Sequence, residues 1–234
     1  PQGLPLLTDA LYVVAGMDAM QILLYLFPVL SAFVVFPVFI LSRRLFGERI
    51  ALVASLLYAV SYTQYFAFSL LYIKQALGLV FLLLALYALE KRSYMLLAVM
   101  IAALGIFHTP EFLLFFLILI PYLMLNRDKK IVYGAVGAAA LILPFWLPRL
   151  DMNWSLFQSA LGTTVSNIQT AGATGGGAFF DFVTYQEFSL AYLAFALIGA
   201  LYLIVRRNWN SIFFYFAINL AMVLFYLFFF RRYI

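Results

Sequence analysis

Three basic residues lie in strongly apolar surroundings, and their chemistry suits phosphate. Arg231 and Arg232 follow three phenylalanines in FFFRRYI, and Lys74 lies in YIKQ within another apolar stretch. A guanidinium can bind two phosphate oxygens in parallel, and a Lys inside a membrane segment usually faces a cavity or a carboxylate. We therefore take Arg232, Arg231 and Lys74 as candidate phosphate ligands. Alternatives stay open: the arginines equally suit ordinary lipid headgroups, and Lys74 suits pairing with Glu111 or reaching the interface.

The single histidine and a few acids form a second set of candidates. His108 and Glu111 are three residues apart, which places them on one face if a helix continues through them. They could orient an acceptor or a divalent cation such as Mg or Mn, although a self-satisfied His-Thr-Pro turn explains them without any ligand. Asp181 and Glu187 flank FVTYQ and are candidates for the same roles. One histidine with scattered acids is a weak metal signal, so the metal ligands stay unassigned.

Composition places these residues in an all-α, polytopic membrane protein. Hydrophobic residues make up 67% of the 234 residues and charged residues 10%, and the mean hydropathy is +1.07. Such a chain carries more apolar surface than a soluble domain of this length needs. Its net charge of +5 then reports membrane orientation and gives no reason to expect nucleic acid. The absence of cysteine excludes disulfides and thiolate metal sites.

Apolar segments predict about eight transmembrane helices, since a crossing needs roughly 20 residues. The segments are 17–41, 50–67, 69–89, 94–107, 110–125, 131–148, 188–205 and 211–230. A single helix over 94–125 would be about 48 Å long, which is too long for an ordinary crossing. His108-Thr109-Pro110 supplies a break there, because proline disfavours helix at the residue before it.

Basic residues orient these helices. Four expected loops hold ten of the 14 Lys and Arg residues: SRRLFGER (42–49), EKRS (90–93), NRDKK (126–130) and RRNWN (206–210). With 94–125 divided, all four loops fall on one side, which the positive-inside rule makes cytoplasmic. The other face then carries the terminal RRYI and most of the acids, and we expect the functional site there.

The expected organisation is one transmembrane domain with four parts. Residues 1–16 end a first external loop and contain an interfacial helix over 4–15. Residues 17–148 form a six-helix block, 149–187 a long external loop, and 188–234 the last two helices. The opening PQGLPLL has neither an initiator Met nor the features of a signal peptide, so we expect an internal piece of a longer protein.

The stretch YLFPVLSAFVVFPVFILSRRLFGERIALVASLLYAVS resembles the second and third transmembrane helices of the GT-C superfamily. The preceding PQGLPLLTDALYVVAGMDAMQ resembles the end of that superfamily's first external loop, and FFFRRYI resembles its Arg-Phe/Tyr element at a late external helix end. Members are polytopic glycosyltransferases that use polyprenyl-phosphate-linked sugars. The resemblance covers most of the chain, and RRLFG with its flanks is its most specific part.

The resemblance implies transfer of a sugar or glycan to a glycan, lipid or protein acceptor on the extracytoplasmic face, most simply in a prokaryotic plasma membrane. It also implies a catalytic carboxylate in the first external loop, before residue 1, with Asp9 as a weak candidate inside the chain. The layout is similar to that of the oligosaccharyltransferase catalytic subunit. However, Asn167 in TTVSNIQ stands where that subunit has Glu, and Lys74 stands near where it has acids. The superfamily is therefore a better match than the subunit.

Two other classes of function stay open. A transporter or flippase for lipid-linked glycans is one, since transporters often carry paired ions on broken helices near mid-membrane. Here the intramembrane charges cluster toward the outer face and the two halves of the chain do not match, which favours an enzyme. A non-catalytic protein that binds a lipid-linked sugar is the other.

Overall fold

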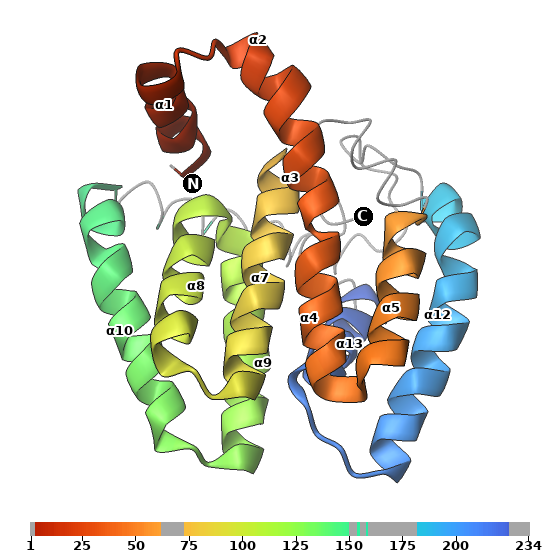
Figure 1. Ribbon diagram of the computed structural model, residues 1–234. Helices are drawn as coiled ribbons and strands as arrows, with labels where there is room; N and C mark the ends of the chain where they lie inside the picture. The colour runs from red at the N-terminus through yellow and green to blue at the C-terminus, as the bar shows by residue number, and fades with distance from the viewer. Residues whose placement is uncertain (1–2, 62–72, 150–153, 155–157, 159–181, 225–234) are drawn as a thin grey trace. The chain divides into compact units, whose positions relative to one another are not determined.

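The computed structural model describes residues 3–61, 73–149, 154, 158 and 182–224 (Figure 1). Throughout these residues the regular structure is helical and no strand occurs, which confirms the all-α prediction. The chain divides into two compact units, Pro1–Phe145 (unit 1) and Trp146–Ile234 (unit 2). Each is described by itself.

The described part of unit 1 is a helical bundle. Its elements are α1 (Gly3–Ala15), α2 (Ala19–Gln21), the π-helical turn η1 (Ile22–Leu26), α3 (Phe27–Phe33), α4 (Val35–Phe46), α5 (Glu48–Ala59), α7 (Ile73–Lys91), α8 (Tyr94–Phe107), α9 (Thr109–Asn126) and α10 (Lys129–Trp146), which ends at the unit boundary. The elements from α2 to α4 follow one another almost without interruption, so the first predicted span is a nearly continuous helical run.

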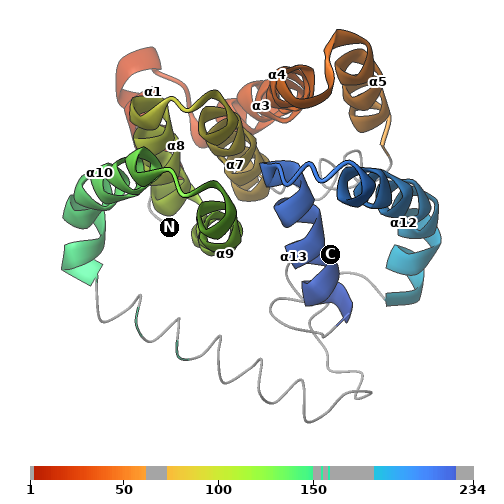
Figure 2. The same cartoon turned by 90° about the horizontal axis from the view of Figure 1, so that it is seen from below.

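The helix α7 is the centre of unit 1. It packs against α3 and α4 on one side and against α8 and α9 on the other (Figure 2). Its sequence, IKQALGLVFLLLALYALEK, is apolar around most of its circumference, as expected of a helix surrounded by protein. Its fully buried side chains are Leu82, Ala85, Leu86, Ala88 and Leu89.

The turn between α4 and α5 differs from the predicted loop. SRRLFGER was expected as a loop over 42–49, but α4 continues through Arg43 and Arg44 to Phe46, and Gly47 alone separates it from α5. Leu and Arg are strong helix formers, whereas Gly47 has φ +90, a conformation that favours glycine and ends the helix. Arg43 and Arg44 lie at the end of the predicted span, as expected, but they belong to the helix and not to a loop.

Two further turns of unit 1 use arginine where glycine is usual. Arg92, after α7, has φ 57, and Arg127, after α9, has φ 47. Ser93 N–H bonds to Ala88 O at 3.0 Å, and Arg127 N–H bonds to Leu123 O at 2.8 Å, so both turns satisfy carbonyls at the end of the preceding helix. A left-handed conformation is unfavourable for arginine, so these turns keep a positive charge at the expense of backbone strain.

The predicted break between the fourth and fifth segments is confirmed. The helix α8 ends at Phe107 and α9 begins at Thr109, with His108 between them in an extended conformation of φ −148 and ψ 95. Pro110 lies in the first turn of α9, where its missing N–H costs nothing.

Small residues of α10 lie where it approaches α8. A Cβ on Gly134 would lie 3.2 Å from both Leu97 Cδ2 and the carbonyl oxygen of Tyr94. Ala138, one turn later, is fully buried. Small residues four apart at a helix contact are typical of membrane helices, which associate by close packing rather than by excluding water.

Unit 2 contains a turn and a helical hairpin in its described part. Its elements are the 3-10 turn η2 (Leu147–Arg149), α12 (Phe182–Val205) and α13 (Ser211–Leu224). Arg207 has φ 52, so this turn repeats the arginine geometry of unit 1. Asn210 caps α13, because its Oδ1 accepts a hydrogen bond from Phe213 N–H at 2.9 Å.

Three segments of the described chain are long and apolar enough to cross a membrane: Leu24–Phe46, Thr109–Asn126 and Lys129–Trp146. The 14 residues of α8 would extend about 21 Å, less than the roughly 30 Å of hydrocarbon in a bilayer. The structure therefore supports long apolar helices, and the full count of eight crossings stays a prediction.

Candidate functional site

The candidate site centres on a buried pair at the junction of α8 and α9. Nδ1 of His108 contacts Oε2 of Glu111, and the two side chains are 15% and 6% exposed. His108 is the single residue between the end of α8 at Phe107 and the start of α9 at Thr109, while Glu111 lies in the first turn of α9. The sequence placed these two residues on one face if a helix continued through them. No helix continues through His108, which occupies the N-cap position of α9, and the two side chains nevertheless meet.

Local sequence explains why the pair forms here. Pro110 starts α9 and confines the residue before it, and the N–H of His108 still bonds to Leu104 O at 2.8 Å as the last bond of α8. A carboxylate in the first turn of a helix is favoured by the positive end of the helix dipole. Backbone geometry thus brings an imidazole and a carboxylate together in a buried position.

Gly78 on α7 makes room for this pair. A Cβ at Gly78 would lie 2.8 Å from His108 Cβ, 2.9 Å from His108 Cγ and 3.2 Å from Glu111 Oε2. Real Cβ atoms do not approach other atoms this closely, so any larger residue would displace the imidazole. Gly78 is itself buried, and it was not among the residues that the sequence singled out.

Lys74 is a neighbour of the site along α7. It falls in the first turn of α7, four residues before Gly78. The spacing of four residues alone relates its position on α7 to that of Gly78. Whether its ammonium binds phosphate, pairs with Glu111 or reaches an interface stays a prediction.

The remaining candidates are not brought to this pair by the described structure. Asp9 lies on α1 and is exposed. Glu187 lies within α12 of unit 2. Asn167, Asp181, Arg231 and Arg232 lie outside the described residues, so their proposed roles stay predictions.

No metal-binding group is seen in the part of the chain that the structure describes: no three side chains among His, Asp and Glu come together there. His108 and Glu111 supply one nitrogen and one carboxylate. A divalent cation at this pair would need further ligands from elsewhere.

Two polar contacts in unit 1 were missed from the sequence. Asp18 and Gln21 cap the start of α2 reciprocally: Gln21 N–H bonds to Asp18 Oδ1 at 2.8 Å, and Asp18 N–H bonds to Gln21 Oε1 at 3.1 Å. The spacing D-x-x-Q is a variant of the capping box and was readable in advance. The second contact joins Tyr94 to Asp128, whose separation in sequence gave no local signal.

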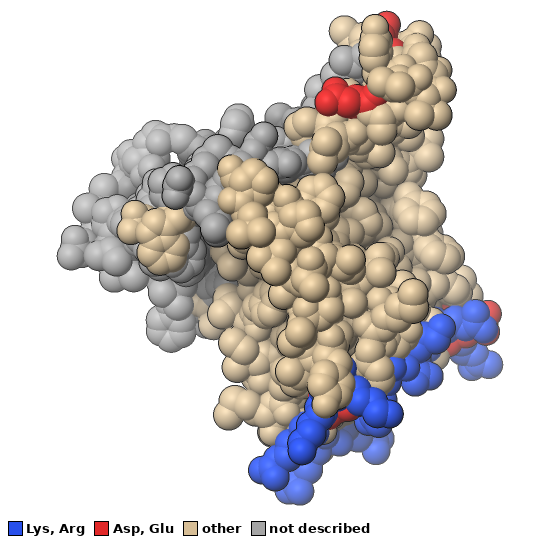
Figure 3. Space-filling model, turned by 90° about the vertical axis from the view of Figure 1, so that its left-hand side faces the viewer, with Lys and Arg blue, Asp and Glu red and all other residues tan. Residues whose placement is uncertain are grey.

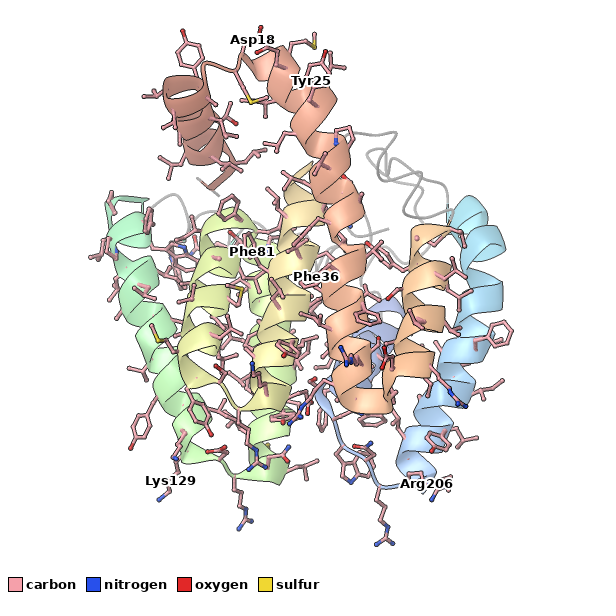
Figure 4. All side chains as sticks on the ribbon, viewed as in Figure 1. Asp18, Tyr25, Phe36, Phe81, Lys129 and Arg206 are labelled. Atoms are coloured by element: carbon pink, nitrogen blue, oxygen red, sulfur yellow. The ribbon has the colours of Figure 1, made fainter. Side chains whose placement is uncertain are left out.

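Charge is distributed unevenly along unit 1. Apart from Lys74, the basic side chains of unit 1 gather at the end formed by the α4–α5, α7–α8 and α9–α10 turns (Figure 3). Lys129 lies at this end and Asp18 at the opposite end (Figure 4). The helix α8 starts at the basic end with Tyr94, so His108 lies at its other end.

No family model, curated protein or solved structure matches the chain.

Proposed function

We propose that the chain is an integral, multi-pass membrane protein of the GT-C type, which transfers a sugar or glycan from a polyprenyl-phosphate-linked donor to an acceptor on the extracytoplasmic face. The observation that carries this proposal is the buried His108–Glu111 pair at the end of α8 away from the basic turns. If the basic turns are cytoplasmic, the pair belongs to the outer half of the membrane domain. The resemblance of YLFPVLSAFVVFPVFILSRRLFG to the superfamily supports the same assignment.

The pair suits the acceptor side of such a reaction. The acceptor oxygen forms a bond to the anomeric carbon while the bond from that carbon to the phosphate oxygen breaks, so the lipid phosphate leaves as an anion. The hydroxyl proton must pass to a base. An imidazole held by a carboxylate is oriented to take a hydrogen bond from that hydroxyl, and this is the role we assign to His108, with Glu111 as its positioning residue.

Lys74, Arg231 and Arg232 are assigned to the departing phosphate. Cations that face the oxygens of a leaving phosphate stabilise its developing charge. Lys74 is the member of this set whose position is described, four residues before Gly78 on α7.

The test is donor turnover by the full chain in its membrane. The protein is incubated with a panel of polyprenyl-phosphate- and diphosphate-linked sugars together with glycan, lipid and protein acceptors that carry hydroxyl groups, and release of the lipid phosphate is measured. We expect His108→Gln to lower turnover by roughly 100-fold, and Lys74→Gln to weaken donor binding. The control is Glu48→Gln, an exposed carboxylate beside Arg43 at the basic end, which should leave turnover unchanged.

The competing function is proton-coupled transport of a lipid-linked glycan, and the same pair is the observation that favours it. Buried ionisable residues within membrane segments commonly carry protons in transporters. Proteoliposomes distinguish the two functions. Movement of the glycan driven by a pH gradient and abolished by Glu111→Gln, with no lipid phosphate released from any donor, would replace the enzyme assignment with a transporter.

A further inference from the structure

Five cations lie together on the α7–α8 and α9–α10 turns. We call this group the double-turn cluster: Lys91, Arg92, Arg127, Lys129 and Lys130. The two turns are held side by side because Tyr94 Oη donates a hydrogen bond to Asp128 Oδ2 at 2.9 Å. All five side chains are exposed. The acids on these turns, Glu90 and Asp128, leave the group with a net positive charge.

Helix electrostatics accounts for part of this cluster only. Lys91 ends α7 and Arg127 follows the last residue of α9, where a positive charge offsets the negative end of the helix dipole. Lys129 and Lys130 instead occupy the first turn of α10, which contains no acid. A cation at that end of a helix is unfavourable. The carboxylate of Asp128, which caps α10, offsets part of this charge, and both lysine side chains remain exposed.

The outward face of α10 is apolar directly beyond these lysines. Tyr133 is 71% exposed and Val136 is 61% exposed, and they follow Lys129 by four and seven residues, so all three share one face. The opposite face of α10, with Ile131, Gly134, Ala138 and Ile142, is buried. Along the open face of α10, the lysines at the helix start are followed by the ring of Tyr133 and then by the aliphatic side chain of Val136.

We propose that this face of α10, with the double-turn cluster at its end, is a binding site for an anionic phospholipid. The headgroup phosphate lies against Lys129 and Lys130, the Tyr133 ring lies at the level of the ester groups, and an acyl chain follows Val136. Juxtamembrane lysines and arginines attract anionic lipids, and tyrosine is favoured at the membrane interface. Free phosphate offers the same anion but makes no use of the apolar stripe. The proposal depends on membrane insertion and is independent of sugar transfer.

The test measures lipid selectivity at Tyr133. Tyr133→Trp places a fluorophore at the site, and the signal of the three native tryptophans is subtracted with the parent chain. The protein is placed in nanodiscs that contain brominated phosphatidylglycerol or brominated phosphatidylcholine. Quenching then gives the association constant of phosphatidylglycerol relative to phosphatidylcholine. We expect a ratio well above one, which K129Q/K130Q lowers by about fivefold or more.

The matched control is R43Q/R44Q, which removes two cations from the last turn of α4 and should leave the ratio unchanged. A ratio near one in the Tyr133→Trp protein that keeps both lysines would overturn the proposal. An equal loss in R43Q/R44Q would also overturn it, because general surface charge would then explain the selectivity. Inorganic phosphate and chloride are also added at the same ionic strength. If phosphate lowers the ratio to one and chloride does not, the lysines bind free phosphate instead of a phospholipid. If the double variant fails to fold, the two single variants are measured in the same way.

Discussion

Tyr94 and Asp128 join the first residue of α8 to the turn between α9 and α10, with 2.9 Å between Oη and Oδ2. The same carboxylate accepts a bond from Lys130 N–H at 3.0 Å through Oδ1. Both bonds favour the ionised acid, and the bond from Tyr94 is the larger cause that holds the pKa of Asp128 below its ordinary value of 3.8. One side chain thus caps α10 and connects two hairpins.

Tyr94→Phe should lower the Tm at neutral pH by removing the phenol that holds Asp128. Because the pKa of Asp128 is lowered by folding, its contribution to stability is present above the ordinary pKa and disappears as the pH falls through the lowered one. The Tm difference between parent and variant should therefore narrow below about pH 4. Thermal unfolding in detergent across acidic pH checks this, with Tyr25→Phe, an exposed tyrosine, as the control. A difference that does not change with pH would contradict the assignment to Asp128.

Gly78→Ala should destabilise unit 1 by about 1–3 kcal/mol, because a Cβ there overlaps His108 and approaches Glu111. The matched control is Gly137→Ala on α10, where the new Cβ would meet Ala98 Cβ at an ordinary 3.5 Å. That variant should be neutral or more stable by up to about 1 kcal/mol, since alanine favours helix over glycine. Unfolding by SDS titration measures both. Similar behaviour of the two variants would show that α7 does not approach the pair as described.

A double-mutant cycle on His108 and Glu111 should give a coupling free energy of about 1–3 kcal/mol. The reason is that the pair is buried, so either single alanine variant leaves a buried polar partner unsatisfied. The double variant should be more stable than the sum of the single losses predicts. Additive losses would mean that the two side chains do not interact in the folded membrane protein.

Arg127→Gly should be more stable than Arg127→Ala by about 1 kcal/mol, because Arg127 has φ 47 and glycine adopts that conformation without a Cβ penalty. Both variants remove the same charge, so their difference isolates the backbone term. The free energy of unfolding of each variant in detergent is the measurement. If alanine is the more stable of the two, the turn does not have a left-handed residue at this position.

The sequence predicted helix ends well where a specific residue such as proline interrupts the helix. His108-Thr109-Pro110 located the end of α8 and the start of α9 within a residue. The loop expected over 42–49 was wrong. Charge was taken as a mark of a loop, but arginine is a good helix former, and Arg43 and Arg44 are exposed in the last turn of α4. Gly47 was the better stop signal there.

The candidate site was predicted in part. His108 and Glu111 were found because they are close in sequence and their contact follows from local backbone geometry. Gly78 was not found, because its importance comes from the approach of α7 to the α8–α9 junction, and nothing within QALGLV reports that approach. The same holds for Tyr94 and Asp128, whose contact depends on how two hairpins lie together.

His108 is both the C-cap of α8 and the N-cap of α9, so a single residue connects the two helices. One residue inserted anywhere in α8 would rotate the junction by about 100° around the helix axis, turning the imidazole away from Gly78. Homologous chains that keep this pair should therefore hold the length of α8 constant and accept insertions at other turns. In an alignment of such chains, the α8–α9 junction should therefore show fewer insertions and deletions than the other turns.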